Sequence, residues 1–211
     1  MYALAVNDFV KNRILRHHDT ATGMHAAAIS TSSAILICAA LTAPKLYSGL
    51  SFINPQAMET TYCNPSTKPV FAKCIRAVYN TPVIGSFMYN LKYNRAAIMD
   101  KLSKVSGLEV AQKNELADSM YEAAHTGGYY GRFLLASIHG NLLNSDIARM
   151  LSKLSTPILI VTGSADRQAK KALPAFDIDK ENISSVILED ISAPQLECPD
   201  KLARILNSFF N

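Results

Sequence analysis

The sequence has few charged residues, no block of one charge sign and no paired cysteine spacing. Charged side chains make up 18% of the 211 residues and apolar ones 49%, which is typical of a globular rather than a disordered chain. The net charge of +4 comes from 21 basic and 17 acidic side chains spread along the chain. Without a basic block interleaved with aromatics, nothing favours DNA or RNA as a partner. The length suffices for one large α/β domain or two small ones.

The cysteine pattern gives no sign of disulfides or of zinc. The four cysteines lack CxxC spacing and lie partly in apolar segments, so we expect buried free thiols and a reducing, cytoplasmic location; they stand at positions 38, 63, 74 and 198. Residues 1–18 show no basic n-region ahead of an apolar stretch, so no secretion signal is expected. Metal-ligand spacing, a phosphate loop and a dinucleotide fingerprint are also missing, and we expect no cofactor.

The most apolar window, "HAAAISTSSAILICAALTAP" at 25–44, is interrupted by serines and threonines. It has about the minimum length of a membrane span, but it relies on alanine, whose transfer from water gains little. It divides better into a short buried strand over 24–29, a turn of small residues, and a helix over 33–42 that stops before Pro44. We therefore expect neither a membrane span nor a membrane partner.

Hydrophobic periodicity predicts the other helices and strands on either side of this turn. A helix is expected over 3–15, and a strand in "KLYSGLSFINP" that ends at Asn54-Pro55. The segments between 56 and 150 have helical periodicity, with proline and glycine as breaks. Further on, "PILIVTG" is typical of a strand buried on both faces, "SSVILEDI" predicts another strand, and "CPDKLARILNSFF" a closing amphipathic helix.

This order of elements, together with the turn at its front, resembles the C-terminal part of an α/β-hydrolase. In that family a G-x-S-x-G elbow between a strand and a helix forces a serine into a strained turn that exposes its Oγ. The matching stretch here is "AISTSS", in which Ser30 takes the nucleophile position. Ala28, Ser32 and Ser33 stand where the family typically has glycine.

The resemblance covers nearly the whole chain and implies a fold class and a domain division. It implies an α/β fold with a truncated α/β-hydrolase-like parallel sheet of about four strands, built from 1–55 and 151–211, and an α-helical cap over 56–150. Since the family's sheet has about eight strands, the loop that donates one oxyanion-hole N–H is expected upstream of Met1, which leaves only the N–H of Thr31. The strand over 24–29 would then be an exposed edge, which invites pairing with another chain.

Two further segments carry the resemblance. In "PILIVTGSADR", Asp166 follows Gly163 by three residues, where the family has the acid that orients the catalytic histidine. "DISAPQLECPDKLARIL" resembles the family's closing G-H-x-P-x-x-E-x-P-E segment, but Ser192 stands at the histidine position. Because a serine cannot act as a general base near neutral pH, the implied Ser-His-Asp triad is incomplete. His125, in the helical insertion, is the first candidate for a substitute base.

Each of these residues also has a structural interpretation. Ser30 can be a helix N-cap in a turn of small residues. Asp166 can be a loop aspartate beside Arg167. His125 can be a helix-end histidine before a glycine C-cap, where the helix dipole favours it.

Three hypotheses about function follow. In the first, the chain is a serine hydrolase that acts on a small acyl substrate such as an ester, with Ser30 as nucleophile, Asp166 as acid and either His125 or no residue as base. It would be weak, because the loss of one oxyanion donor alone costs roughly a hundredfold to a thousandfold in rate. In the second, it is a non-catalytic relative that binds a small apolar ligand or a partner protein. In the third, it is a fragment, either from a gene model that starts at an internal methionine or completed by another chain.

Overall fold

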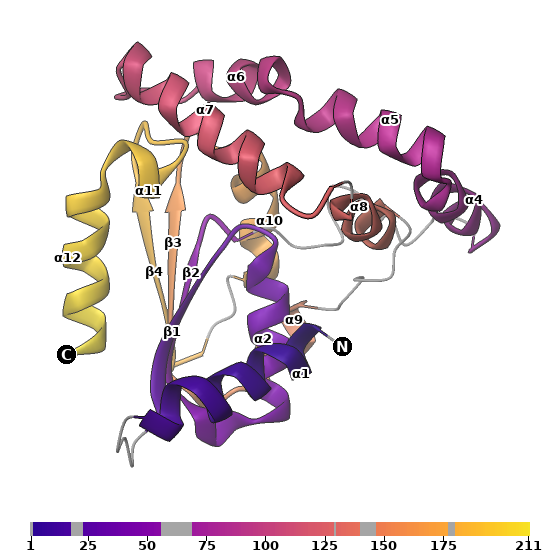
Figure 1. The fold of residues 1–211 in the computed structure, drawn as a ribbon. Helices are drawn as coiled ribbons and strands as arrows, with labels where there is room; N and C mark the ends of the chain where they lie inside the picture. The colour runs from indigo at the N-terminus through magenta and orange to yellow at the C-terminus, as the bar shows by residue number, and fades with distance from the viewer. Residues whose placement is uncertain (1, 18–22, 56–68, 129, 140–146, 177–179) are drawn as a thin grey trace. The chain divides into compact units, whose positions relative to one another are not determined.

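The computed structural model describes the chain except for residues 1, 18–22, 56–68, 129, 140–146 and 177–179 (Figure 1). The chain divides into two compact units, which we describe separately. The sheet unit comprises Met1–Thr60 and Ser145–Asn211, and the helical unit comprises Thr61–Asn144.

The sheet unit is built on a four-stranded sheet in the order β1-β2-β3-β4, in which all neighbouring strands run parallel. The strands are β1 (Met24–Ile29), β2 (Tyr47–Ile53), β3 (Ile158–Gly163) and β4 (Ile183–Leu188). The predicted α/β class and the parallel sheet of about four strands are confirmed. Since every strand runs the same way, the four carboxyl ends lie along one edge of the sheet.

Helices cover both faces of this sheet (Figure 1). The helices of the sheet unit are α1 (Tyr2–Phe9), α2 (Ser32–Thr42), α9 (Ile147–Leu151), α10 (Arg167–Phe176), α11 (Pro194–Glu197) and α12 (Pro199–Phe210). Helix α1 continues as a π-helical turn to Ile14 and a 3₁₀ turn to His17, and α2 is followed by the 3₁₀ turn η3 (Pro44–Leu46). The predicted helices over 33–42 and at the carboxyl end are confirmed.

Two details differ from the sequence prediction. No helix was expected between the last two strands, yet α10 lies there, because two parallel neighbours in a sheet need a crossover connection. The fourth strand was expected to continue through "SSVILEDI", whereas β4 ends at Leu188. Asp190, with a φ of 60°, turns the chain away from the sheet at this point.

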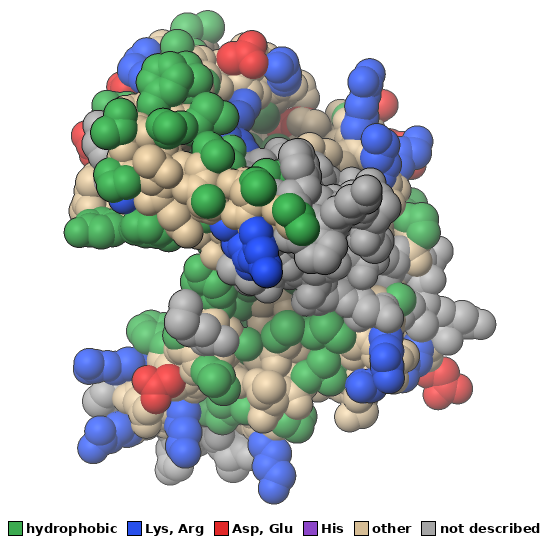
Figure 2. Space-filling model, turned by 90° about the vertical axis from the view of Figure 1, so that its right-hand side faces the viewer, with side chains coloured by type: hydrophobic (Ala, Val, Ile, Leu, Met, Phe, Trp, Pro, Cys, Tyr) green, Lys and Arg blue, Asp and Glu red, His purple; other side chains and the backbone are tan. Residues whose placement is uncertain are grey.

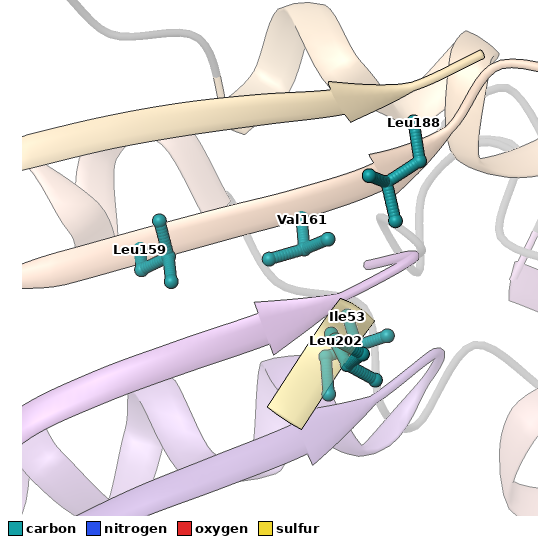
Figure 3. Close-up of a cluster of buried hydrophobic side chains, with 5 residues drawn as sticks. All are labelled: Ile53, Leu159, Val161, Leu188 and Leu202. Carbon is teal, nitrogen blue, oxygen red and sulfur yellow. The ribbon is translucent and has the colours of Figure 1, made fainter. Parts of the chain in front are cut away.

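The core between the sheet and α12 is a compact apolar cluster (Figure 3). Leu159 and Val161 of β3 lie beside Ile53 and Leu188 from the neighbouring strands, and Leu202 meets them from α12. All six residues of β3 are buried, because this strand has a neighbour on either side and helices over both faces. The prediction of a strand buried on both faces is confirmed.

Asn7 is a buried polar residue that joins α1 to α2 and β2. Its Nδ2 donates to the carbonyl oxygen of Ala39 and to Thr42 Oγ1, each at 2.9 Å. The Tyr47 hydroxyl donates to Asn7 Oδ1 at 2.7 Å. Burial raises the pKa of Tyr47, so the phenol keeps the proton that this bond uses. The network therefore satisfies these polar groups where water cannot reach them.

The helical unit consists, in its described part, of α4 (Pro69–Asn80), α5 (Pro82–Tyr93), α6 (Arg95–Ser103), α7 (Val110–His125) and α8 (Gly131–His139). Helix α4 packs against α5 and α8, and α6 packs against α7. Asn94 separates α5 from α6, and its Oδ1 caps α6 by accepting from the N–H of Ala97 at 2.8 Å. Within the described ranges, no helix combines the length and the apolar character needed to cross a bilayer.

The cysteines only partly follow expectation. Cys74 in α4 and Cys198 before α12 are free thiols. Cys198 is half-buried, but Cys74 is exposed, so the expectation of buried thiols is wrong for Cys74. It lies on the outer side of an amphipathic helix rather than in a core segment. Cys63 lies outside the described residues.

The Asn7 network predicts a stability difference between two asparagines of the same N-terminal segment. Asn7→Ala should lower the free energy of unfolding by about 1 to 3 kcal/mol, because it leaves the buried Tyr47 hydroxyl without its acceptor. Asn12→Ala is the control, since Asn12 donates to the exposed side chain of Asp8. Urea unfolding measures both variants, and equal losses would contradict the role given to Asn7.

Candidate active site

Ser30 forms the turn between β1 and α2, at the carboxyl edge of the sheet. Its φ is 57°, in the left-handed region, where a residue with a Cβ is strained by roughly 1 kcal/mol or more. Its N–H donates to the carbonyl oxygen of Ile53 at 2.9 Å, which ties the turn to β2. The N-cap of α2 is Thr31 rather than Ser30, and it makes no side-chain cap bond. A strained serine between a strand and a helix is the geometry of a nucleophile elbow.

Ser32 occupies a place where the resemblance leads one to expect glycine, and it closes the turn with its own side chain. Its Oγ donates to the carbonyl oxygen of Ile29 at 2.6 Å and lies 3.2 Å from the Ile29 N–H. The Ser33 N–H donates to the carbonyl oxygen of Ser30 at 3.2 Å. A serine at position 32 is thus accommodated by bonds within the turn.

Thr31 supplies the only backbone donor that the sequence led us to expect for an oxyanion. Its φ and ψ of −64° and −22° already belong to the helical region. The sheet unit, as far as it is described, shows no acceptor for this N–H. An N–H at the start of a helix also lies where the helix dipole favours negative charge. Thr31 can therefore donate to an oxygen beside Ser30.

Asp166 lies in the turn after β3, and both of its carboxylate oxygens accept hydrogen bonds. Oδ1 accepts from the N–H groups of Gln168 at 2.8 Å and Ala169 at 3.2 Å, so it caps the first turn of α10. Oδ2 accepts from Asn54 Nδ2 at 3.2 Å. The carboxylate is thus fixed by a helix start on one side and by an amide on the other.

Asn54 is a site residue that sequence reasoning missed. It ends β2, is 4% exposed and has a φ of 43°. Besides its bond to Asp166, its Nδ2 donates to the carbonyl oxygen of Ser192 at 2.6 Å, and its Oδ1 accepts from the Gly163 N–H at 2.7 Å. The available signal was a polar residue directly after an apolar strand, at the edge where parallel sheets place their sites.

Ser192, at the expected histidine position, is bound to Glu197. Its Oγ donates to Glu197 Oε1 at 2.6 Å, and its N–H donates to the same oxygen at 2.9 Å. The N–H of Ala193 is a third donor, at 2.7 Å. The segment also packs against the turn after β3, because a Cβ on Gly163 would meet the carbonyl oxygen of Ile191. Position 192 is therefore held firmly, and the hydroxyl of Ser192, which donates to Glu197, is not itself a base.

The spacing of the sheet sets the distance between Ser30 and Asp166. Ser30 follows β1 and Asp166 follows β3, with β2 between them. Two strand spacings separate Ser30 from Asp166 by about 10 Å. This distance is too long for a direct hydrogen bond between them, but one intervening side chain can span it. In the described part of the sheet unit, no hydrogen bond links either side chain to a histidine.

His125 belongs to the helical unit, where it ends α7. Its Nδ1 lies 2.8 Å from the carbonyl oxygen of Tyr121, and its Nε2 lies 3.1 Å from Asn90 Oδ1. Its ring lies 4.2 Å, between centroids, from that of Tyr121. Both nitrogens thus have partners within the helical unit, an arrangement that favours the structural interpretation of this histidine.

The role of Asn54 can be tested with two substitutions. Asn54→Gly keeps the left-handed backbone accessible and removes the amide, so the free energy of unfolding should fall by about 2 to 3 kcal/mol. Asn54→Ala should be less stable than Asn54→Gly by roughly 1 kcal/mol, because alanine is strained at this φ. Denaturant unfolding measures both. Two variants with wild-type stability would show that the amide does not brace the loops.

No family model and no curated protein sequence matches this chain. Solved structures match it over nearly its whole length. A meta-cleavage product hydrolase from Pseudomonas fluorescens has a TM-score of 0.64 and 16% identity, covering 99% of this chain and 71% of that one. A 2-hydroxy-6-oxo-6-phenylhexa-2,4-dienoate hydrolase from Rhodococcus has a TM-score of 0.60 and 15% identity, covering 99% and 72%. A structure from work on carboxylesterases of Nitrososphaera gargenis has a TM-score of 0.62 and 15% identity, covering 99% and 71%. This chain has the α/β-hydrolase fold.

Proposed function

We propose that this chain is a slow serine hydrolase of the esterase type, acting on a small acyl substrate. The observation that carries the proposal is the left-handed backbone of Ser30 between β1 and α2, beside the donor N–H of Thr31. A strained turn of this kind exposes a serine Oγ at the carboxyl edge of the sheet. The hydrolases and carboxylesterases named among the solved structures of the same fold support it.

The proposed chemistry is acyl transfer to Ser30. Its Oγ bonds to the carbonyl carbon of the ester and loses its proton, while the oxyanion that forms accepts from the Thr31 N–H. The bond to the leaving alcohol then breaks, the alcohol takes up a proton, and water hydrolyses the acyl-serine. The proton of Ser30 passes to solvent, because Ser192 is not a base. A positioned general base raises the reaction rate roughly a hundredfold to ten-thousandfold. Because this chain has no such base at position 192, we expect slow turnover.

A second candidate function is binding without catalysis. In this case the chain would be a non-catalytic relative that binds a small apolar ligand or a partner protein. It is favoured by Ser192, whose hydroxyl is committed to Glu197 where a hydrolase would hold a histidine. The two candidates differ in whether Ser30 reacts.

Labelling with a fluorophosphonate probe separates the two candidates. We expect the full chain to be labelled slowly, and Ser30→Ala to abolish the label, because the probe reacts with an exposed serine Oγ. Ser185→Ala is the control, since Ser185 is an exposed serine of β4 and its loss should leave the label unchanged. A label that survives Ser30→Ala would remove Ser30 from the proposal. An unlabelled wild-type chain would favour the non-catalytic candidate.

Restoring a base tests the assignment of position 192. Ser192→His should raise the rate of p-nitrophenyl acetate hydrolysis by at least about tenfold, because the imidazole would stand between Ser30 and Asp166. The gain should stay below that of a complete triad, because Thr31 is the only oxyanion donor identified. The double variant Ser192→His with Ser30→Ala should fall back to the starting rate. A folded Ser192→His variant without any gain would contradict the assignment.

A further inference from the structure

Helix α5 carries its apolar side chains outside and its polar ones inside. Val83 is 79% exposed and Phe87 is 61% exposed, whereas Ser86 and Asn90 are half-buried. Most helices of folded proteins show the opposite arrangement. The exposed stripe consists of Val83, Ile84, Phe87, Met88 and Leu91.

Packing and hydrogen bonds hold α5 in this orientation. Tyr89 is buried, and its hydroxyl donates to the carbonyl oxygen of Ala124 at 2.7 Å. A Cβ on Gly131 would meet that hydroxyl, so α8 begins directly against α5. Arg132 NH1 donates to Ser86 Oγ at 2.9 Å. Because these contacts use the polar side of α5, the helix cannot turn its apolar stripe inward without breaking them.

The neighbouring elements extend the apolar surface. On α4, Val70 is 71% exposed and Val78 is 42% exposed; beside α5, Tyr130 is 73% and Leu134 is 43% exposed. We call the exposed side chains of α4, of α5 and of residues 130–134 the α5 face. Figure 2 shows hydrophobic side chains gathered on the side of the molecule that these elements present. Neighbouring exposed apolar side chains, unlike single scattered ones, are typical of interaction surfaces.

The chain segments that carry the α5 face contain charges of one sign. Residues 60–99 contain five basic residues and no acidic one, and residues 123–145 contain Arg132 and no acidic one. Lys73 is exposed on α4, beside the apolar side chains. The acidic residues of the unit lie instead on α6, on α7 and just before α7: Asp100, Glu109, Glu115, Asp118 and Glu122. The α5 face is therefore apolar and has the exposed Lys73 beside it, whereas Arg95, at the start of α6, pairs with Asp118 of α7.

We propose that the α5 face binds the surface of a membrane that contains anionic lipids. The apolar side chains of α5 enter the boundary between headgroups and acyl chains, while Lys73 and Arg76 lie near lipid phosphates; this combination is typical of helices that lie in the interface. A second copy of the chain would fit less well, because it would bring the same positive charges to a symmetric contact. A membrane partner was not expected from the sequence, because the apolar window 25–44 divides into a strand and a helix.

Vesicle binding by the full chain tests the proposal. Because the chain has no tryptophan, Phe87→Trp provides a single fluorescent reporter within the face. Its emission should shift to the blue with vesicles of phosphatidylcholine and phosphatidylglycerol, and much less with phosphatidylcholine alone. In a sedimentation assay, Lys73→Gln should weaken binding to the anionic vesicles by about fivefold. Lys171→Gln, which removes an exposed lysine of α10, should leave binding unchanged.

The apolar contribution is tested in the same assay. Leu91→Glu should weaken binding by more than about tenfold, because it places a carboxylate where the face meets lipid. Met120→Glu is the matched control, since Met120 is 42% exposed on α7, outside the α5 face, and it should bind as the wild type does. Equal binding to both vesicle types, or none to either, would overturn the proposal. So would self-association that Leu91→Glu abolishes, or an emission of the Phe87→Trp variant that is already blue-shifted in the lipid-free monomer.

Discussion

The carboxamide of Asn54 holds together three of the four strand ends of the sheet. From the end of β2 it binds the N–H of Gly163, the carboxylate of Asp166 and the carbonyl oxygen of Ser192. A parallel sheet places its strand ends at one edge, but the hydrogen bonds of the sheet do not fix the loops that follow the strands. One buried amide, satisfied on both its oxygen and its nitrogen, fixes the turn after β3 and the segment after β4 at once. The N–H of Ser30 binds β2 one residue earlier, at Ile53, so the fourth strand end lies against the same strand.

Much of the sheet unit could be predicted because its strands are much more apolar than the sequence on either side of them. The run from Ile158 to Gly163 is apolar throughout, and the structure buries all of it. The change from strand to helix near Ser30 was visible because small polar residues interrupt an otherwise apolar window. These features depend on local composition, which a single sequence displays directly.

The features that sequence reasoning missed depend on distant partners. Helix α10 buries Ala169, Ala172 and Phe176 at helical spacing, but Pro174 lies inside it and is typical of a helix break. Asn54 marked only the end of a strand, since its bonding partners lie more than a hundred residues further along the chain. The outward apolar stripe of α5 has ordinary helical periodicity, and periodicity does not say which side of a helix faces its neighbours. His125 shows the same limit, because its partners in α5 and α7 are known only from the fold.

The contact between Gly163 and Ile191 also constrains how this protein can change. The backbone after β3 lies so close to the segment after β4 that a side chain on Gly163 has no room. Backbone bonds from Ser164 to Leu188 and from Ala165 to Ile191 join the two segments over their next residues. An insertion in one segment would shift the other, so their lengths can vary only in a coordinated way. Length changes are therefore more easily accommodated in the connections that lie away from this pair of loops.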